Sequence, residues 1–177
     1  MENYTGEWSD LDRKLLEFIA SRPMGIWFNR LVEEFSELSR VTIMRKLRNL
    51  VQAGLVNVER DPNHSQRKIF KVKEEIVRAI ESIKDIVEES SSKIVGISRE
   101  SQAMDPCHVA MEVFKIVESE FKSIGRVILS ISPIGVPAAS FMSRYAFKVA
   151  SQTFGLIRRV FSGRPEVLDE FQRLSPM

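Results

Sequence analysis

Residues 39–73 read SRVTIMRKLRNLVQAGLVNVERDPNHSQRKIFKVK, and this stretch decides how the first part of the chain is expected to fold. It holds nine Lys or Arg residues and two acidic residues, although the whole chain of 177 residues has a formal net charge of only +2. Apolar residues first recur at helical spacing, a glycine follows, and two strand-like runs flank a polar turn. The stretch therefore predicts a basic amphipathic helix followed by a β-hairpin.

The helix of this stretch is expected to begin near Ser39, whose side chain can cap it. Ile43, Leu47 and Leu50 lie at i, i+4 and i+7, so they are expected to face a core. Gly54 is well placed to end the helix. The basic residues between these apolar positions are then left to project away from the core.

The hairpin is expected to pair residues 55–58 with residues 69–72. Between these strands, residues 61–63 (Asp-Pro-Asn) are typical of a turn.

Upstream of the basic helix, the sequence predicts a helix capped at Ser9 and a minimal strand at residues 26–28. A second helix follows, capped by Asn29. The expected order is helix, short strand, helix, helix, strand, turn, strand.

The segment RVTIMRKLRNLVQAGLVNVERDPNHSQRKIFKV resembles the winged helix-turn-helix of the MarR-type transcriptional regulators, with the ArsR and PadR types close behind. The phrase L-x-x-x-GLV at residues 50–56 is shared by all of these types. Residues 60–62 (Arg-Asp-Pro) followed by Arg67 are most similar to the MarR type. The resemblance covers about residues 10–73 and implies an N-terminal DNA-binding domain over residues 1–73. Unlike the MarR type, the chain has no substantial helix before this domain.

The resemblance implies that the N-terminal half of the third helix enters the major groove, where base edges present a distinctive pattern of donors and acceptors. The side chains expected to read bases there are Arg40, Thr42, Met44 and Arg45. The next cations along the helix are expected to contact phosphate: Lys46 and Arg48. The hairpin would offer four more side chains to the DNA backbone or minor groove: Arg60, His64, Arg67 and Lys68. Asp61 is expected to brace a hairpin arginine.

Other interpretations of residues 39–73 stay open. The cations could form a solvated face of an unrelated helix-and-strand domain. The winged helix could also be a protein–protein interaction module, attached to a membrane through residues 127–143. The absence of any acid in residues 39–57 favours double-stranded DNA as the partner, because a protein-binding surface has no need to exclude negative charge.

Residues 74–177 are expected to form an all-α region, so that the fold class is mainly α with a small β-wing. The helix predicted at residues 74–97 carries an apolar seam with alternating spacings of four and three, with Ser90 as its polar position. The apolar members of the seam are Ile76, Ile80, Ile83, Val87, Ile94 and Ile97. The seam could pack on a helix of the same chain or on its copy in a second subunit. Self-association into a homodimer is favoured, because two-fold operators are read by dimers.

A second helix is predicted at residues 107–124, with Phe121 among its inward residues, and a third at residues 137–161. Residues 127–143 carry no charge but contain two prolines and a glycine, which favours a buried hinge over a membrane span. These apolar helices could enclose a small-molecule effector, as in sensor regulators, although the same residues build any helical core.

Composition and motifs argue against several other classes. The polar, acidic N-terminus is not a secretory signal, and the single cysteine, Cys107, excludes an internal disulfide, so a cytoplasmic protein is expected. The sequence has no phosphate loop, dinucleotide fingerprint or hydrolase motif, so neither an enzyme nor a cofactor is expected. Cys107 and His108 with Asp105 are too sparse for a metal site. Cys107 could have a redox role, but a lone cysteine is usually buried as a small hydrophobic residue.

Overall fold

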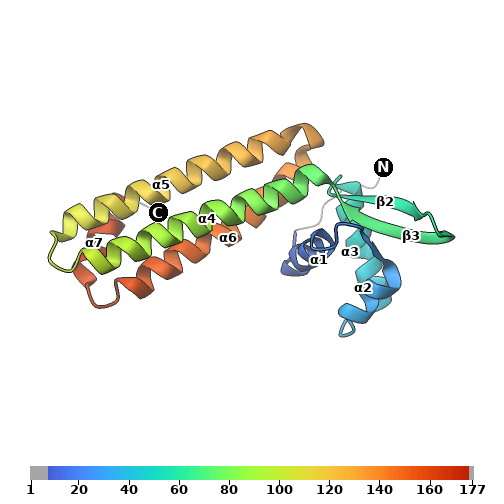
Figure 1. The fold of residues 1–177 in the computed structure, drawn as a ribbon, viewed down its shortest axis with the longest axis horizontal. Coiled ribbons are helices and arrows are strands. Elements are labelled where there is room, and N and C mark those ends of the chain that lie inside the picture. The colour runs from blue at the N-terminus through green and yellow to red at the C-terminus, as the bar shows by residue number, and fades with distance from the viewer. Residues whose placement is uncertain (1–7, 176–177) are drawn as a thin grey trace. The chain divides into compact units, whose positions relative to one another are not determined.

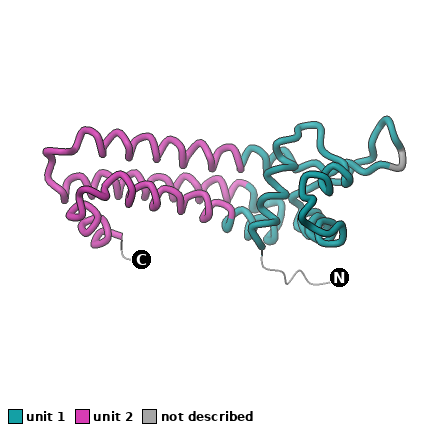
Figure 2. Tube along the Cα trace, turned by 90° about the horizontal axis from the view of Figure 1, so that it is seen from below, with its two compact units in different colours: residues 1–79, 131–144 teal, residues 80–130, 145–177 magenta. Residues whose placement is uncertain are grey.

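A computed structural model describes residues 8–175, with only the backbone described at residues 65 and 66. Residues 1–7, on which the expectation of no secretory signal partly rests, lie outside the described residues. The chain is mainly helical and contains a small antiparallel sheet (Figure 1). It divides into two compact units, coloured in Figure 2. Unit 1 comprises residues 1–79 and 131–144, and unit 2 comprises residues 80–130 and 145–177.

Unit 1 contains the elements predicted around the basic stretch, in the predicted order. They are α1 (Asp10–Ala20), β1 (Ile26–Trp27), α2 (Phe28–Glu34), α3 (Arg40–Gln52), β2 (Val56–Asp61) and β3 (His64–Val72). Local side-chain bonds define two of the helix starts. Ser9 and Asp12 form a reciprocal capping box at α1, and the Ser39 hydroxyl accepts a hydrogen bond from the Thr42 amide, 3.1 Å away, at α3. Asn29 does not cap α2, because that helix begins at Phe28 directly after β1.

The sheet has the strand order β1–β3–β2, and both pairings are antiparallel. Ile26 of β1 lies opposite Phe70 of β3, and Val58 of β2 lies opposite the same residue from the other side. The turn before β1 requires a glycine. Gly25 has φ +77°, and a Cβ there would lie 2.4 Å from Cγ2 of Ile69.

The core of unit 1 confirms the expected inward face of α3. Ile43, Leu47 and Leu50 are fully buried. Other fully buried side chains of the unit include Leu15, Leu16, Ile19, Leu31 and Leu55. Gly54, with φ +75°, follows the C-cap of α3, as predicted.

Residues 131–144 belong to unit 1, although the sequence had grouped them with the C-terminal helices. The Trp8 ring meets the Phe141 ring edge-on, with centroids 4.7 Å apart. Arg144 Nη1 also donates a hydrogen bond to the Trp8 carbonyl at 3.3 Å. The chain turns here through η1 (Ser132–Ile134) and Gly135, but the predicted hinge is not buried, because Ser132 and Pro133 are exposed and Val136 is 82% exposed. Within the described residues, no helix is both long and apolar enough to cross a membrane.

Unit 2 is built from four helical segments within the described residues. They are α4 (Glu74–Glu100) from residue 80, α5 (Pro106–Ile131) up to residue 130, α6 (Val136–Val160) from residue 145, and α7 (Pro165–Leu174). One apolar cluster joins them and includes Ile94, Val113, Ile157, Phe161 and Phe171. Arg164 ties the loop before α7 to the loop after α4, because it donates hydrogen bonds to the carbonyls of Ser101 and Met104.

The apolar seam of α4 is buried within a single chain, which corrects its assignment as a subunit interface. Five of its six residues are at most 6% exposed: Ile76, Ile80, Ile83, Val87 and Ile94. The sixth, Ile97, packs against the core of unit 2. The intramolecular alternative therefore accounts for the seam, and its five buried side chains leave no free apolar surface for a second subunit.

Candidate nucleic-acid interface

One face of α3 is exposed along its length. Val41, Arg45, Arg48 and Gln52 recur at i, i+4, i+7 and i+11, and all four are exposed. Arg45 and Arg48 have no hydrogen-bond or ion-pair partner in the part of the chain that the structure describes. Two guanidinium groups are therefore free to meet an anionic partner on this face.

Arg40 and Met44 lie on the flank of α3 that meets α2 and the sheet. Arg40 Nη2 donates a hydrogen bond to Asn29 Oδ1 at 2.9 Å, and its guanidinium carbon lies 5.3 Å from the centre of the Phe28 ring. These contacts hold Arg40 in place without neutralising its charge. Met44 is partly buried beside Phe28. Both residues thus border the exposed face and do not occupy its centre.

Thr42 and Lys46 lie on the opposite flank, and the structure removes Lys46 from the expected phosphate contacts. Lys46 Nζ donates to Asp12 Oδ2 at 2.8 Å and to Ser9 Oγ at 3.0 Å, and its side chain is only 15% exposed. The ammonium group is therefore committed to a buried carboxylate on α1. Thr42 is turned toward the cap, because its hydroxyl lies 2.9 Å from that of Ser39.

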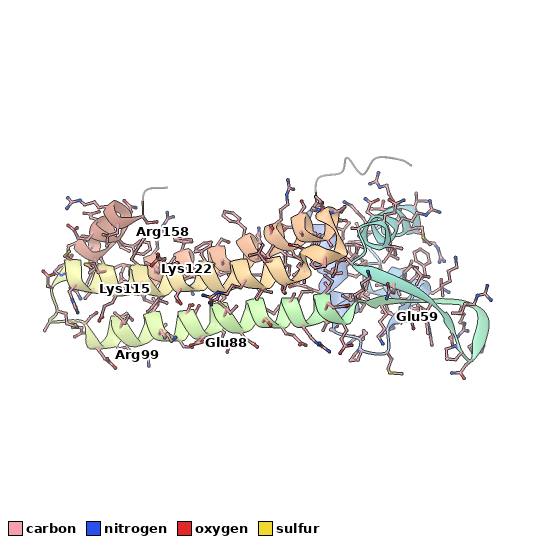
Figure 3. The ribbon with its side chains drawn as sticks, turned by 90° about the horizontal axis from the view of Figure 1, so that it is seen from above. Glu59, Glu88, Arg99, Lys115, Lys122 and Arg158 are labelled. Atoms are coloured by element: carbon pink, nitrogen blue, oxygen red, sulfur yellow. The ribbon has the colours of Figure 1, made fainter. Side chains whose placement is uncertain are left out.

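The β2–β3 hairpin presents the other predicted cations. Arg60, His64 and Lys68 are exposed, with no partner among the described residues. Arg67 lies over Trp27, with its guanidinium carbon 5.1 Å from the ring centre. Glu59, an acid midway along β2 opposite Ile69, is labelled in Figure 3.

Asp61 does not brace a hairpin arginine, contrary to the prediction. It is buried, and its Oδ1 accepts a hydrogen bond from the Asn63 backbone N–H at 2.8 Å. Asp61 therefore stabilises the turn itself, as Asp side chains do in Asx turns.

Unit 1 contains a groove of about 470 Å³, which is bordered by the start of α2, by α3 and by β3. Its lining residues are Trp27, Phe28, Asn29, Glu33, Met44, Arg67, Lys68 and Phe70. The one carboxylate among them, Glu33, is paired with Arg30 at 2.8 Å. The groove therefore brings together Met44 of the helix with Arg67 and Lys68 of the hairpin, which the sequence had placed on separate elements.

Two exposed residues of this region were missed by the sequence analysis. Val41 lies one turn before Arg45 on the open face of α3, and Trp27 supports Arg67. Val41 could have been found by its angular position on the helix, because residues at i and i+4 share a face. The contact of Trp27 with Arg67 depends on the pairing of β1 with β3, and the sequence around Trp27 contains no pattern that predicts this pairing.

Within the described residues, no group of three or more His, Cys, Asp or Glu side chains is placed to hold a metal ion. Asp105 Oδ2 accepts the His108 backbone N–H at 2.9 Å at the start of α5. Cys107 is exposed, so it is not the small buried hydrophobic residue that a lone cysteine usually is.

Unit 2 contains a buried carboxylate that the sequence analysis did not anticipate. Glu120 of α5 is almost completely buried, and the Thr153 hydroxyl of α6 lies 3.1 and 3.0 Å from its two carboxylate oxygens. Burial raises the pKa of Glu120, and hydrogen bonds from Thr153 and Ser90 partly oppose this effect. Glu120 also lines a groove of about 400 Å³ between α4 and α5.

Comparison of the chain with protein-family models, with curated proteins and with solved structures finds no match.

Proposed function

We propose that the chain is a transcriptional regulator that binds duplex DNA as a homodimer, with unit 1 folded as a winged helix-turn-helix. In this proposal α2 and α3 form the helix-turn-helix pair, and the β2–β3 hairpin is the wing. The element order and the β1–β3–β2 sheet support this assignment. They match what the resemblance of the basic stretch to MarR-type regulators leads us to expect.

The observation that carries the proposal is the exposed, acid-free face of α3. Arg45 and Arg48 project from it without partners, and an α-helix of this size fits the major groove of B-DNA. Arginine can bind guanine O6 and N7 with two hydrogen bonds, and Val41 can contact a thymine methyl group. We assign Arg45 and Val41 to base reading and Arg48 to base or phosphate contact.

The hairpin supplies contacts that position the domain on DNA. Arg60, His64 and Lys68 have the exposure needed to reach phosphate oxygens. Arg67 and Arg40 keep their charge while stacked on Trp27 and Phe28. Stacking restricts where their guanidinium groups lie, so less side-chain entropy is lost when they bind phosphate.

Salt-dependent binding to duplex DNA tests the proposal. The full chain is titrated into a labelled random-sequence duplex, and then into duplexes selected from a random pool, at several salt concentrations. Each lost phosphate contact should lower the slope of log affinity against log salt by about 0.9, whereas a lost base contact should reduce sequence preference. Arg45→Ala and Arg48→Ala are each expected to produce one of these changes.

The matched control is Arg99→Ala, since Arg99 is an exposed arginine of α4 in unit 2 (Figure 3). It is expected to bind both kinds of duplex like the unmodified chain. Affinity that does not fall with salt, or equal losses in all three variants, would contradict the assignment of α3. Selective capture of a protein by unit 1 without any duplex binding would favour the interaction-module alternative.

A further inference from the structure

Helix α5 has a second apolar face in addition to the one in the core of unit 2. Val109, Val113 and Val117 are buried in that core. Phe121 was expected to face inward with them, but it is 40% exposed. The reason is that Glu120 occupies the inward position, and the next residue lies about 100° further around the helix. A helix with apolar residues on two faces offers the second face to a further partner.

Helix α6 extends this second face with further aromatic side chains. Phe147 is 70% exposed, and Phe154 follows it two turns later. Phe154 also meets Phe121 of α5, with ring centroids 6.1 Å apart. Together with Ser175 the two helices line an apolar groove of about 630 Å³, whose aromatic residues are Phe114, Phe121, Phe147 and Phe154. Phe114 and Phe154 are partly buried, because they also pack against the core of unit 2.

The charges at this groove cancel. Among the residues that the structure describes, the charged ones that line it are Glu118 and Lys122, and Lys122 Nζ lies 2.8 Å from Glu118 Oε1 (Lys122 is labelled on α5 in Figure 3). An aromatic face with no net charge does not repel a copy of itself.

The shape of the face suits a second copy of the same chain. A two-fold interface joins one patch to itself, so the patch must carry both a projection and a hollow to receive it. Phe147 is the projection, and it borders the groove that is the hollow. Gly125 and Gly155 lie one turn beyond Phe121 and Ser151, and a Cβ at either glycine would meet nothing within 4 Å. A partner helix could therefore approach the backbone closely at both positions.

We infer that the α5–α6 aromatic face, defined by Phe114, Phe121, Phe147 and Phe154, is the surface through which two copies of this chain associate. Phe147 of each copy would enter the groove of the other. This inference deepens the proposed function. It rests on that function in one respect, which is that a regulator of this kind binds DNA as a dimer. It replaces the α4 seam, which is buried within one chain.

Sedimentation velocity of the full chain without DNA, across the micromolar range, tests the inference. We expect the unmodified chain to sediment as a dimer. Phe147→Glu should raise the dissociation constant by about a hundredfold or more, because each of the two copies would bury an unpaired carboxylate in an apolar groove. Ser151→Arg, which fills the same groove from an exposed position, should act in the same direction.

The matched control is Leu129→Glu. Leu129 is 71% exposed on α5 but does not line the groove. We expect this variant to dimerise like the unmodified chain, with circular dichroism confirming that all variants are folded. A monomeric unmodified chain would overturn the inference. So would a Phe147→Glu chain that dimerises normally, or equal disruption by Leu129→Glu.

Two further measurements separate the other outcomes. If the unmodified chain is monomeric but binds phosphatidylglycerol vesicles, and Phe147→Glu abolishes that binding, the face is a lipid-binding surface and the inference is wrong. The duplex titration tests the proposed function independently. A dimer that binds no duplex would defeat the DNA proposal alone, whereas a monomer that binds duplex would defeat the dimer surface alone.

Discussion

Replacing Lys46 with methionine is expected to destabilise unit 1 while leaving the salt dependence of the proposed DNA binding nearly unchanged. Lys46 Nζ joins α3 to the first turn of α1, through Asp12 Oδ2 at 2.8 Å and Ser9 Oγ at 3.0 Å. Methionine keeps an unbranched apolar side chain of similar length but removes the ammonium group. The substitution therefore isolates the ion pair from the packing of the side-chain stem.

The expected loss follows from what surrounds Asp12. This residue is 1% exposed, and without Lys46 its carboxylate would keep only the Ser9 backbone N–H at 2.7 Å and the Ser9 hydroxyl at 2.6 Å. Removing one partner of a buried ion pair costs about 3–5 kcal/mol. Lys46 is partly solvated, and the N-terminus of α1 still favours a negative charge, so we expect a loss of about 2–3 kcal/mol.

Tryptophan fluorescence provides an assay specific to unit 1. The chain has two tryptophans, Trp8 and Trp27, and both belong to this unit. In a urea titration followed by their emission, a loss of this size should lower the unfolding midpoint by about 1–2 M. The slope of log affinity against log salt, measured on the same preparation, should stay close to that of the unmodified chain.

Two further variants make this test specific. Arg48→Met removes a cation from the exposed face of the same helix and should change stability by no more than about 0.5 kcal/mol. When Asp12→Asn is also present, Lys46→Met should cost less stability, because no buried carboxylate is then left without its ion-pair partner. An unchanged urea midpoint together with a lowered salt slope would show that Lys46 contacts phosphate and that the reasoning is wrong.

Two other substitutions test features of each unit. Burial raises the pKa of Glu120, so the native state holds that proton more tightly than the unfolded chain. Stability of unit 2 should then fall as pH rises through and above the ordinary carboxyl range. Glu120→Gln should therefore raise the melting temperature followed by circular dichroism near neutral pH, with a gain that disappears on acidification; a gain independent of pH would count against the buried charge. Gly25→Ala should cost more than about 2 kcal/mol in the tryptophan assay, because its Cβ would lie 2.4 Å from Ile69 Cγ2 at a positive φ. Gly96→Ala is the control, followed by circular dichroism because Gly96 belongs to unit 2. A Cβ there, near the C-terminal end of α4, would meet nothing within 4 Å and should stabilise the chain, and equal losses in both variants would refute the steric argument.

The elements of unit 1 could be predicted because their signals are local. Ser39 and Gly54 mark the two ends of α3 within a few residues of the helix itself, and Asp61 lies in the turn that it stabilises. The same locality explains the error at Asn29. A capping residue in the sequence does not show that the preceding strand leads directly into the helix, and Asn29 instead accepts a hydrogen bond from Arg40.

Partners distant in sequence could not be predicted in the same way. Helical periodicity showed that the seam of α4 is buried, but it does not distinguish a helix of the same chain from one of another. Lys46 posed the same difficulty, because its partner Asp12 lies 34 residues earlier on α1. Residues 131–144 also join unit 1 through tertiary contacts such as Trp8 with Phe141, which no local pattern encodes.

The basic stretch therefore offers a DNA duplex fewer free cations than its sequence suggests. Lys46 is neutralised by Asp12, whereas Arg40 and Arg67 remain charged but are held against aromatic rings. Counterion release depends on the charges that reach phosphate and not on the number in the sequence. Because Arg45 and Arg48 share the exposed face with Val41, affinity should depend on that face together with the hairpin cations, and not on residues 39–73 as a diffuse positive charge.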